Sequence, residues 1–268
     1  MKLLLVFLLF AASLRAQTVK PETSQAFGCY VQSAEARMQA KSMFLEADSS
    51  AALREQLVRN HNIVTILANG PNPHKLPGGM LYDWIGTVFI PGTTLDRIVR
   101  MLQDYDHRAQ YFSEIVSAAK LFCRTGEGRF RFSMRLKEPA VIDTENDVVW
   151  ERVDQYRWRC RSYSTKVQEI GKQHNYLFRL NSYWRFAETA QGVYVQGETI
   201  TLSGEFSSLM RTLGSLAGIN PEKSLKKTLE EMRESQLKPG LDFALPPAGL
   251  PDCGDPYRAL GCPAVSVH

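Results

Sequence analysis

The sequence predicts an α+β fold, in which an antiparallel sheet of about seven strands is closed by C-terminal helices and preceded by an N-terminal helical extension. Three observations support this class. A strand-like stretch begins near residue 80 and a short helix follows it. Six more strand-like stretches lie between residues 115 and 203. Several of these stretches alternate apolar and charged residues, as half-buried strands do. Leucines at helical spacing then occupy the region after residue 203.

The overall composition is that of a folded protein. Of the 268 residues, 44% are hydrophobic and 22% are charged, which excludes collagen, a disordered tail and a polytopic membrane protein. The formal charge of +4 is modest, and neither a basic block nor zinc-finger spacing accompanies it. Nucleic acid is therefore not an expected partner.

Residues 1–16 have the features of a secretory signal peptide. Lys2 precedes the apolar run 3–10, and small residues then lead to Ala16. The run is shorter than the about 20 residues that a membrane span needs. We therefore expect export to the periplasm or the extracellular space. Removal of Lys2 and Arg15 with the signal lowers the formal charge to +2.

Residues 17–79 are expected to form the helical extension. The segments 33–45 and 51–58 are rich in residues that favour helix, and the segment 60–67 then turns apolar and β-branched. The segment 69–79 combines prolines and glycines, so it marks the boundary with the next domain.

The next domain spans residues 80–236. It begins with a strand at 80–91, which is rich in aromatic and β-branched residues and is stopped by a Pro-Gly pair. Thr93 or Thr94 caps a helix whose apolar residues recur at helical spacing. These residues are Leu95, Ile98, Val99 and Leu102. Residues 104–112 are expected to form a second short helix or a loop.

The strands expected between residues 115 and 203 carry rows of like charge. On 129–136, arginines alternate with apolar residues, so that one face is buried and the other is in water. An acidic row on the next strand would lie opposite these arginines and opposite those of the following strand. Each pair of opposite charges would stabilise the sheet by about 0.2 to 1 kcal/mol. We therefore interpret the arginines as structural. The acidic residues are Asp143, Glu145, Asp147 and Glu151, and the later arginines are Arg157, Arg159 and Arg161.

Two helices are expected to close the domain, and a tail follows them. The pair Asn220-Pro221 marks the start of the second helix as its cap and first residue. Residues 237–268 contain six of the thirteen prolines and are expected to form an extended, appended tail. The apolar face is formed by Leu209, Leu213 and Leu216 in the first helix, and by Leu225, Leu229 and Met232 in the second.

The five cysteines predict one disulfide in the tail. In an exported protein, Cys253 and Cys262 are close enough in sequence to close a small loop. Cys29, Cys123 and Cys160 then remain, and their pairing is left open. We interpret Cys123 and Cys160 as small buried residues.

The order of these elements resembles the START-like, helix-grip fold of the SRPBCC superfamily. Segments 84–95, 104–106, 162–165 and 179–186 also resemble a group of exported bacterial proteins within that superfamily, most clearly in their Trp-Ile-Gly and Ser-Tyr-Trp-Arg-Phe stretches. The resemblance covers residues 80–236. It implies a curved sheet wrapped around the C-terminal helix, with an apolar cavity between them. Members of the superfamily bind lipids, sterols or polyketides there, and some are cyclases or hydrolases.

Residues on the expected concave face are the candidate ligand contacts. Glu198 shares a face with Ile200 and Leu202, so it would also contact the ligand if these two residues face the cavity. Glu198 and Asp106 are the candidates for acid–base catalysis. The other candidate contacts are Phe130, Phe132, Met134, Trp150, Trp158, Phe178, Ser182, Trp184, Leu225 and Leu229.

Sequence signatures of enzymes and cofactor sites are absent. There is no nucleophile elbow and no nucleotide-binding loop, and the five histidines lack metal-ligand spacing. We therefore predict a protein that binds or carries a small hydrophobic molecule, a lipid or an isoprenoid, with transient membrane contact and without a cofactor. One alternative is a cavity enzyme of cyclase, hydrolase or isomerase type that uses a buried carboxylate. The other is a protein-interaction module in which side chains fill the cavity.

Overall fold

The computed structural model describes residues 19–40, 42–113, 115–137, 141–171, 177–204 and 220–254. Its centre is one antiparallel sheet in the order β1-β3-β9-β8-β7-β6-β5-β4, with β2 also paired to β3. The strands are β1 (Val64–Leu67), β2 (His74–Leu76), β3 (Gly79–Pro91), β4 (Val116–Gly126), β5 (Arg129–Leu136), β6 (Ile142–Arg152), β7 (Arg157–Glu169), β8 (Leu177–Thr189) and β9 (Gly192–Gly204).

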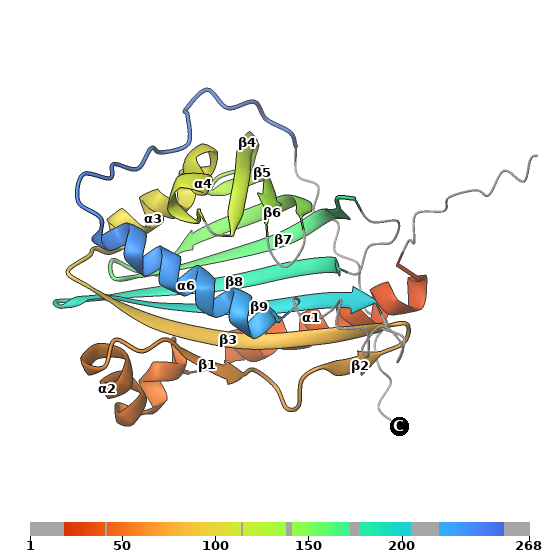
Figure 1. Ribbon diagram of the computed structural model, residues 1–268, viewed down its shortest axis with the longest axis horizontal. Coiled ribbons are helices and arrows are strands. Elements are labelled where there is room, and N and C mark those ends of the chain that lie inside the picture. Colours follow the sequence, from red (N-terminus) through yellow and green to blue (C-terminus); the bar gives the residue numbers. More distant parts are fainter. Residues whose placement is uncertain are drawn as a thin grey trace, which may run out of the picture.

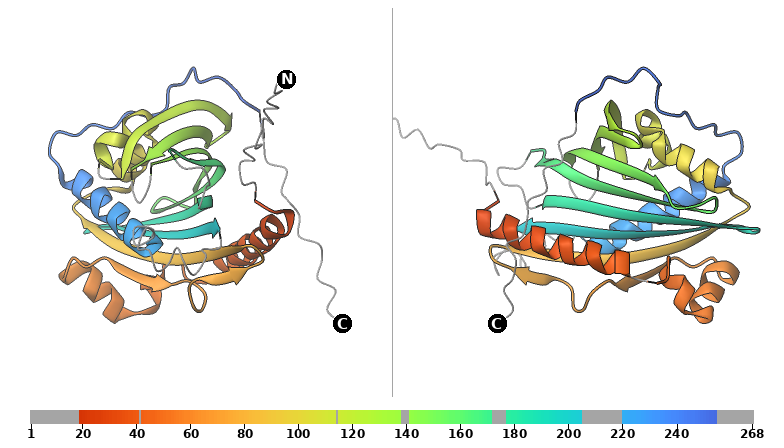
Figure 2. Two further views of the ribbon diagram at one scale, coloured as in Figure 1. Left: turned by 45° about the vertical axis from the view of Figure 1, so that its right-hand side comes forward. Right: turned by 180° about the vertical axis from the view of Figure 1, so that it is seen from behind.

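Helices cover both faces of this sheet (Figure 1). The curved sheet wraps around the C-terminal helix, and the N-terminal helix runs along the opposite face (Figure 2). We call these the concave face and the outer face. The helices are α1 (Pro21–Ala40), α2 (Ala51–Arg59), α3 (Leu95–Gln103), α4 (Arg108–Tyr111) and α6 (Pro221–Leu237), with 3-10 turns η1 (Glu46–Ser49) and η2 (Tyr105–His107). The predicted α+β, helix-grip fold of START-like type is confirmed by this arrangement.

The predicted caps and boundaries of the domain helices are also confirmed. Thr94 accepts a hydrogen bond from the backbone N–H of Arg97 at the start of α3. Asn220 accepts one from the N–H of Lys223 at the start of α6, where Pro221 is the first residue. Between α3 and β4 the chain forms η2 and α4, where a second short helix or a loop was expected.

Opposed charges stabilise the outer face, as predicted. In the strand register, Arg131 lies opposite Asp147 and Arg135 opposite Asp143, and each arginine donates two hydrogen bonds to its carboxylate. Glu151 and Arg159 form a third cross-strand pair at 2.6 Å. Arg131, Arg135 and Arg159 are therefore structural, because acidic residues of β6 neutralise them.

Two glycines let large side chains approach the concave face closely. Gly86 of β3 and Gly197 of β9 are cross-strand partners. A Cβ atom at Gly86 would lie 2.7 Å from the Leu229 side chain of α6, and one at Gly197 would lie 2.5 Å from the ring of Trp184. Only a residue without a side chain leaves space for both contacts.

The N-terminal region is part of the same sheet and does not form a separate helical unit. β1 pairs antiparallel with β3, from Val64 opposite Thr87 to Leu67 opposite Trp84, and β2 pairs antiparallel with the start of β3. These two strands raise the predicted seven strands to nine. α1 covers apolar residues of the outer face and forms a second core with them. That core contains Phe27, Ala34, Leu81, Phe178, Tyr183, Ile200 and Leu202.

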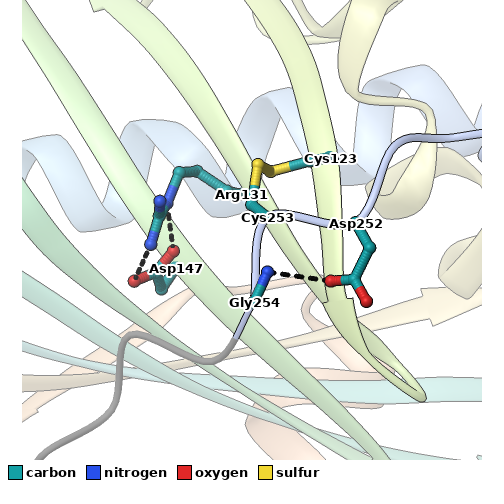
Figure 3. The surroundings of a disulfide bond; sticks show 6 residues. All are labelled: Cys123, Arg131, Asp147, Asp252, Cys253 and Gly254. Atoms are coloured by element: carbon teal, nitrogen blue, oxygen red, sulfur yellow. Dashed lines mark hydrogen bonds and ion pairs between the residues drawn. A yellow bond between two sulfur atoms is a disulfide. The ribbon is translucent and has the colours of Figure 1, made fainter.

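The tail after α6 packs against the domain, and a disulfide ties it to β4 (Figure 3). Cys253 bonds to Cys123, with a Cα–Cα distance of 5.9 Å. Leu241, Phe243 and Leu250 of the tail pack against the apolar core that the concave face forms with α3 and α6. The tail is therefore a strap across the molecule.

The predicted Cys253–Cys262 loop is wrong, because Cys253 already pairs with Cys123. The backbone explains the pairing: Arg124 exchanges hydrogen bonds with Pro251 and Cys253, so the tail lies alongside the edge strand β4. Cys123 is therefore not a free buried thiol, whereas Cys160 is. Cys29 also takes part in a disulfide.

Several predictions concern residues outside the described ranges. These are the signal peptide at 1–16, the first closing helix with Leu209, Leu213 and Leu216, and Cys262. Within the described ranges, no helix combines the length and apolar character needed to cross a membrane.

Candidate functional site

A cavity of about 210 Å³ lies between the concave face and α6. Strands β3 to β9 form its floor, α6 forms its roof, and α3 and α4 contribute one end. Most of its wall is apolar. The apolar wall includes Leu102, Phe112, Phe132, Met134, Val148, Trp150, Leu180, Trp184, Leu225 and Met232.

Six of the predicted contact residues line this cavity. They are Phe132, Met134, Trp150, Ser182, Trp184 and Leu225. Three others, Phe130, Trp158 and Leu229, belong to the surrounding apolar core but do not form the cavity wall. Leu229 packs at Gly86, and Trp158 packs edge-on against Trp150 with ring centroids 6.4 Å apart.

Phe178 lies on the outer face, contrary to prediction. The register of β8 against β9 shifts between Leu177 and Arg179, which marks a β-bulge. Strict alternation places Phe178 with Leu180 and Ser182, but the bulge places Leu177 in the cavity wall instead and turns Phe178 toward α1. Nothing in the local sequence signalled the extra residue.

Glu198 is also on the outer face, so its predicted place in the cavity is wrong. It does share a face with Ile200 and Leu202, as expected, but these two residues pack in the core beneath α1. The alternate residues Thr199, Thr201 and Ser203 of β9 line the cavity. The error arose because α1 buries the outer face, and apolar residues there were taken for the cavity face.

Asp106 is a structural residue of an exposed turn and does not line the cavity. Its carboxylate accepts hydrogen bonds from the backbone N–H of Leu121, at 2.8 Å, and from the Lys120 ammonium group, at 3.1 Å. It thereby attaches η2 to β4.

The cavity contains polar groups that sequence reasoning missed. The hydroxyls of Thr199 and Thr201 are buried and have no hydrogen-bond partner. Arg108, at the start of α4, is the one charged residue of the described chain in the cavity wall. Burial raises the pKa of the Cys160 thiol to about 12, so this residue lines the cavity as a neutral group.

Glu198 belongs to a buried cluster that fastens α1 to the sheet. Arg37 of α1 donates a hydrogen bond to Glu198 and lies 3.5 Å from Asp83 of β3. Tyr30 of α1 donates a hydrogen bond of 2.8 Å to Asp83. Burial, followed by the charge of Asp83, raises the pKa of Glu198 to about 7, although Arg37 opposes the shift. Burial likewise raises the pKa of Asp83.

A second hollow, of about 230 Å³, lies between α1 and the outer face. It is similar in volume to the first, but polar residues make up a larger share of its wall, including Ser24, Gln32, Glu35, Ser164, Arg179 and Asn181. Glu35 accepts hydrogen bonds from Tyr163 and Tyr183 there. The nature of the wall therefore makes the concave-face cavity the better site for an apolar ligand.

The described residues contain no group of three or more histidine, cysteine or acidic side chains that could hold a metal ion. No carboxylate or imidazole of those residues lines the concave-face cavity either. The site thus offers an apolar surface, hydroxyl groups and one guanidinium.

Comparison with known proteins gives similarity in structure but not in sequence. No family model and no curated protein matches the sequence. A STAR-related lipid transfer protein fragment from Xanthomonas axonopodis is 16% identical with a TM-score of 0.45, over 62% of this chain and 97% of that one. A START superfamily protein from Mycobacterium smegmatis is 8% identical with a TM-score of 0.43, over 59% and 97%. Human StAR-related lipid transfer protein 5 is 10% identical with a TM-score of 0.41, over 71% and 95%.

Proposed function

We propose that this protein binds a hydrophobic molecule, a lipid or an isoprenoid, in the cavity between the sheet and α6. The observation that carries the proposal is the unfilled, mostly apolar cavity itself. Covering apolar surface stabilises a complex by about 25 cal/mol per Å². Burial of apolar surface would therefore contribute strongly to the binding free energy of a ligand that fills the cavity.

The empty space is a local feature of the packing. α6 contacts the sheet closely at Gly86, where its leucines leave no space for a side chain. Farther along, small residues such as Ser162 and Ser182 line the floor where larger ones would fill the gap. The hypothesis of an interaction module with a filled cavity does not fit this arrangement.

The described cavity favours binding over acid–base catalysis. Glu198 is sealed beneath α1, and Asp106 lies in the exposed turn η2. The cavity wall formed by the described residues contains neither a carboxylate nor a histidine that could transfer a proton. The cavity-enzyme hypothesis thus loses both of its candidate residues.

Export is part of the proposal. A signal peptide would direct the chain out of the cytosol, and the Cys123–Cys253 disulfide supports an oxidising compartment, because such bonds persist there. Export is tested by fractionating host cells, locating the mature chain among the fractions, and measuring whether Cys123 and Cys253 are oxidised there. Reduced, full-length protein in the cytosol would contradict export.

The ligand is tested by native mass spectrometry of protein purified from its host without detergent. We expect an added mass that organic solvent extracts as an apolar molecule. Ser162→Phe places a ring in the cavity and should exclude it. Gln168→Phe, on an exposed position of the same strand, is the matched control and should keep it. Absence of any bound molecule, together with no binding across a panel of lipids, would refute the proposal.

A further inference from the structure

Arg108 places a positive charge in the wall of an otherwise apolar cavity. Its guanidinium carbon lies 4.7 Å from the ring centroids of both Tyr105 and Phe132. Its Nη2 donates a hydrogen bond of 2.7 Å to the Leu102 carbonyl. Part of the residue stays accessible because it lines the cavity, yet its Nε atom is buried and has no hydrogen-bond partner.

Among the described residues, no carboxylate forms an ion pair with this charge. Asp104 contributes a favourable charge, but its oxygens are occupied by other groups. They accept from the Tyr111 hydroxyl and from the backbone N–H of Ala244, at 3.0 Å, and one lies 2.7 Å from Nδ1 of His107. Burial accordingly lowers the pKa of Arg108, although an arginine stays protonated in a protein.

A buried cation without an ion pair is unfavourable, because it loses its water without gaining a counter-charge. The two aromatic rings compensate only in part, since a cation–π contact is weaker than a charge-assisted hydrogen bond to an anion. The Nε–H also has no acceptor, so the hydrogen-bonding capacity of this guanidinium is only partly used.

We infer that the ligand is an amphiphile with an oxyanion head group, which binds the guanidinium of Arg108 while its apolar part fills the cavity. The inference rests on the proposed function. A carboxylate or a phosphate has the two oxygens that a planar guanidinium recognises. Neutral lipids and hydrocarbons of the same length should bind less tightly.

The test compares probes that share a chain and differ in the head group. Dodecanoate, monododecyl phosphate and dodecanol are titrated into ligand-free protein by calorimetry at about pH 8, where the carboxylate is ionised. A hydrogen bond to a charged group predicts a preference of about 10- to 100-fold for at least one anion over the alcohol. Equal binding of all three would overturn the inference but leave the proposed function intact. No binding of any of them would overturn the inference; the proposed function fails only if native mass spectrometry and the lipid panel are negative as well.

Variants assign the preference to one residue. Arg108→Met should abolish the preference for the anion and leave dodecanol binding within a few-fold, which also shows that the variant folds. Arg124→Met is the matched control, because Arg124 also lies over a phenylalanine ring, that of Phe130 at 5.2 Å, but is not in the cavity wall. An unchanged preference in Arg108→Met would overturn the inference. If that variant does not fold, the comparison is made with Arg108→Lys, which keeps the charge and should keep part of the preference.

Discussion

Two carboxylates share one arginine beneath α1. Asp83 is fully buried and Glu198 nearly so, and Arg37 is the cation that contacts both. If both acids were ionised, two buried negative charges would share one contacting cation, with Arg185 as a further cation near Glu198. Burial raises the pKa of both acids, and the charge of Asp83 raises that of Glu198 further. One of the two acids therefore keeps its proton up to near-neutral pH.

Glu198→Gln should remove the resulting pH dependence. The pKa of Glu198 rises from 4.5 in the unfolded chain to about 7 in the folded protein, so the folded state binds the extra proton. Ionisation therefore destabilises the fold increasingly between these values, by on the order of 3 kcal/mol once complete. We expect the variant to gain stability relative to the natural protein as the pH rises from about 5 to about 8.

Urea unfolding at each pH measures this difference. Glutamine can still accept the hydrogen bond from Arg37, and Arg37 then pairs with Asp83 alone. Glu55→Gln, at an exposed position of α2, should follow the natural protein at every pH. Parallel stability curves for Glu198→Gln and the natural protein would contradict the shared-proton interpretation.

At the level of single residues, alternation predicted the faces of β5, β6 and β7 because each of these strands has one apolar and one charged side. It failed on β9, where both sides are buried: Ile200 and Leu202 contact α1, whereas Thr199 and Thr201 face the cavity. The more apolar side of such a strand is not necessarily the ligand side. Only the position of α1 distinguishes them, and that depends on contacts distant in the sequence.

At the level of elements, the tail is a strap held at several points. Phe243 packs edge-on against Tyr111 and beneath the guanidinium of Arg97. Cys253 then anchors the chain to β4 across a sequence separation of 130 residues. The composition correctly indicated an extended segment, but it could not show what the segment contacts, since proline-rich chain has no periodic face.

Replacing both Cys123 and Cys253 by serine should destabilise the protein by about 2 to 4 kcal/mol, because the bond limits the freedom of the unfolded chain. Urea unfolding under non-reducing conditions measures the loss. Cys160→Ser removes the buried free thiol and serves as a variant that leaves the strap intact.

The pairing itself is checked by mass spectrometry of a non-reduced digest. A linked pair of peptides that contains Cys123 and Cys253 is expected. A peptide closed between Cys253 and Cys262 would contradict the structure and restore the loop predicted from the sequence.

The whole molecule has one sheet with two differently used faces. The outer face is closed by α1 and by cross-strand ion pairs, and the concave face retains a cavity beneath α6. The order of strands and helices predicted this concave side, including six residues of the cavity wall. It did not predict Arg108, because an arginine in a short helix between two longer elements has no distinguishing pattern in the sequence.

The cavity links ligand binding to the stability of the whole fold. A ligand that binds only the folded state stabilises it by about 2.7 kcal/mol at a concentration about 100 times its Kd. Dodecanoate should therefore raise the free energy of unfolding of the natural protein by this amount, at a concentration set by the calorimetric Kd. In Ser162→Phe, the new ring occupies the cavity, so the same addition should change the free energy little. An equal gain in the free energy of unfolding in both proteins would mean that dodecanoate binds outside the cavity, because the phenylalanine ring already occupies the cavity in the variant.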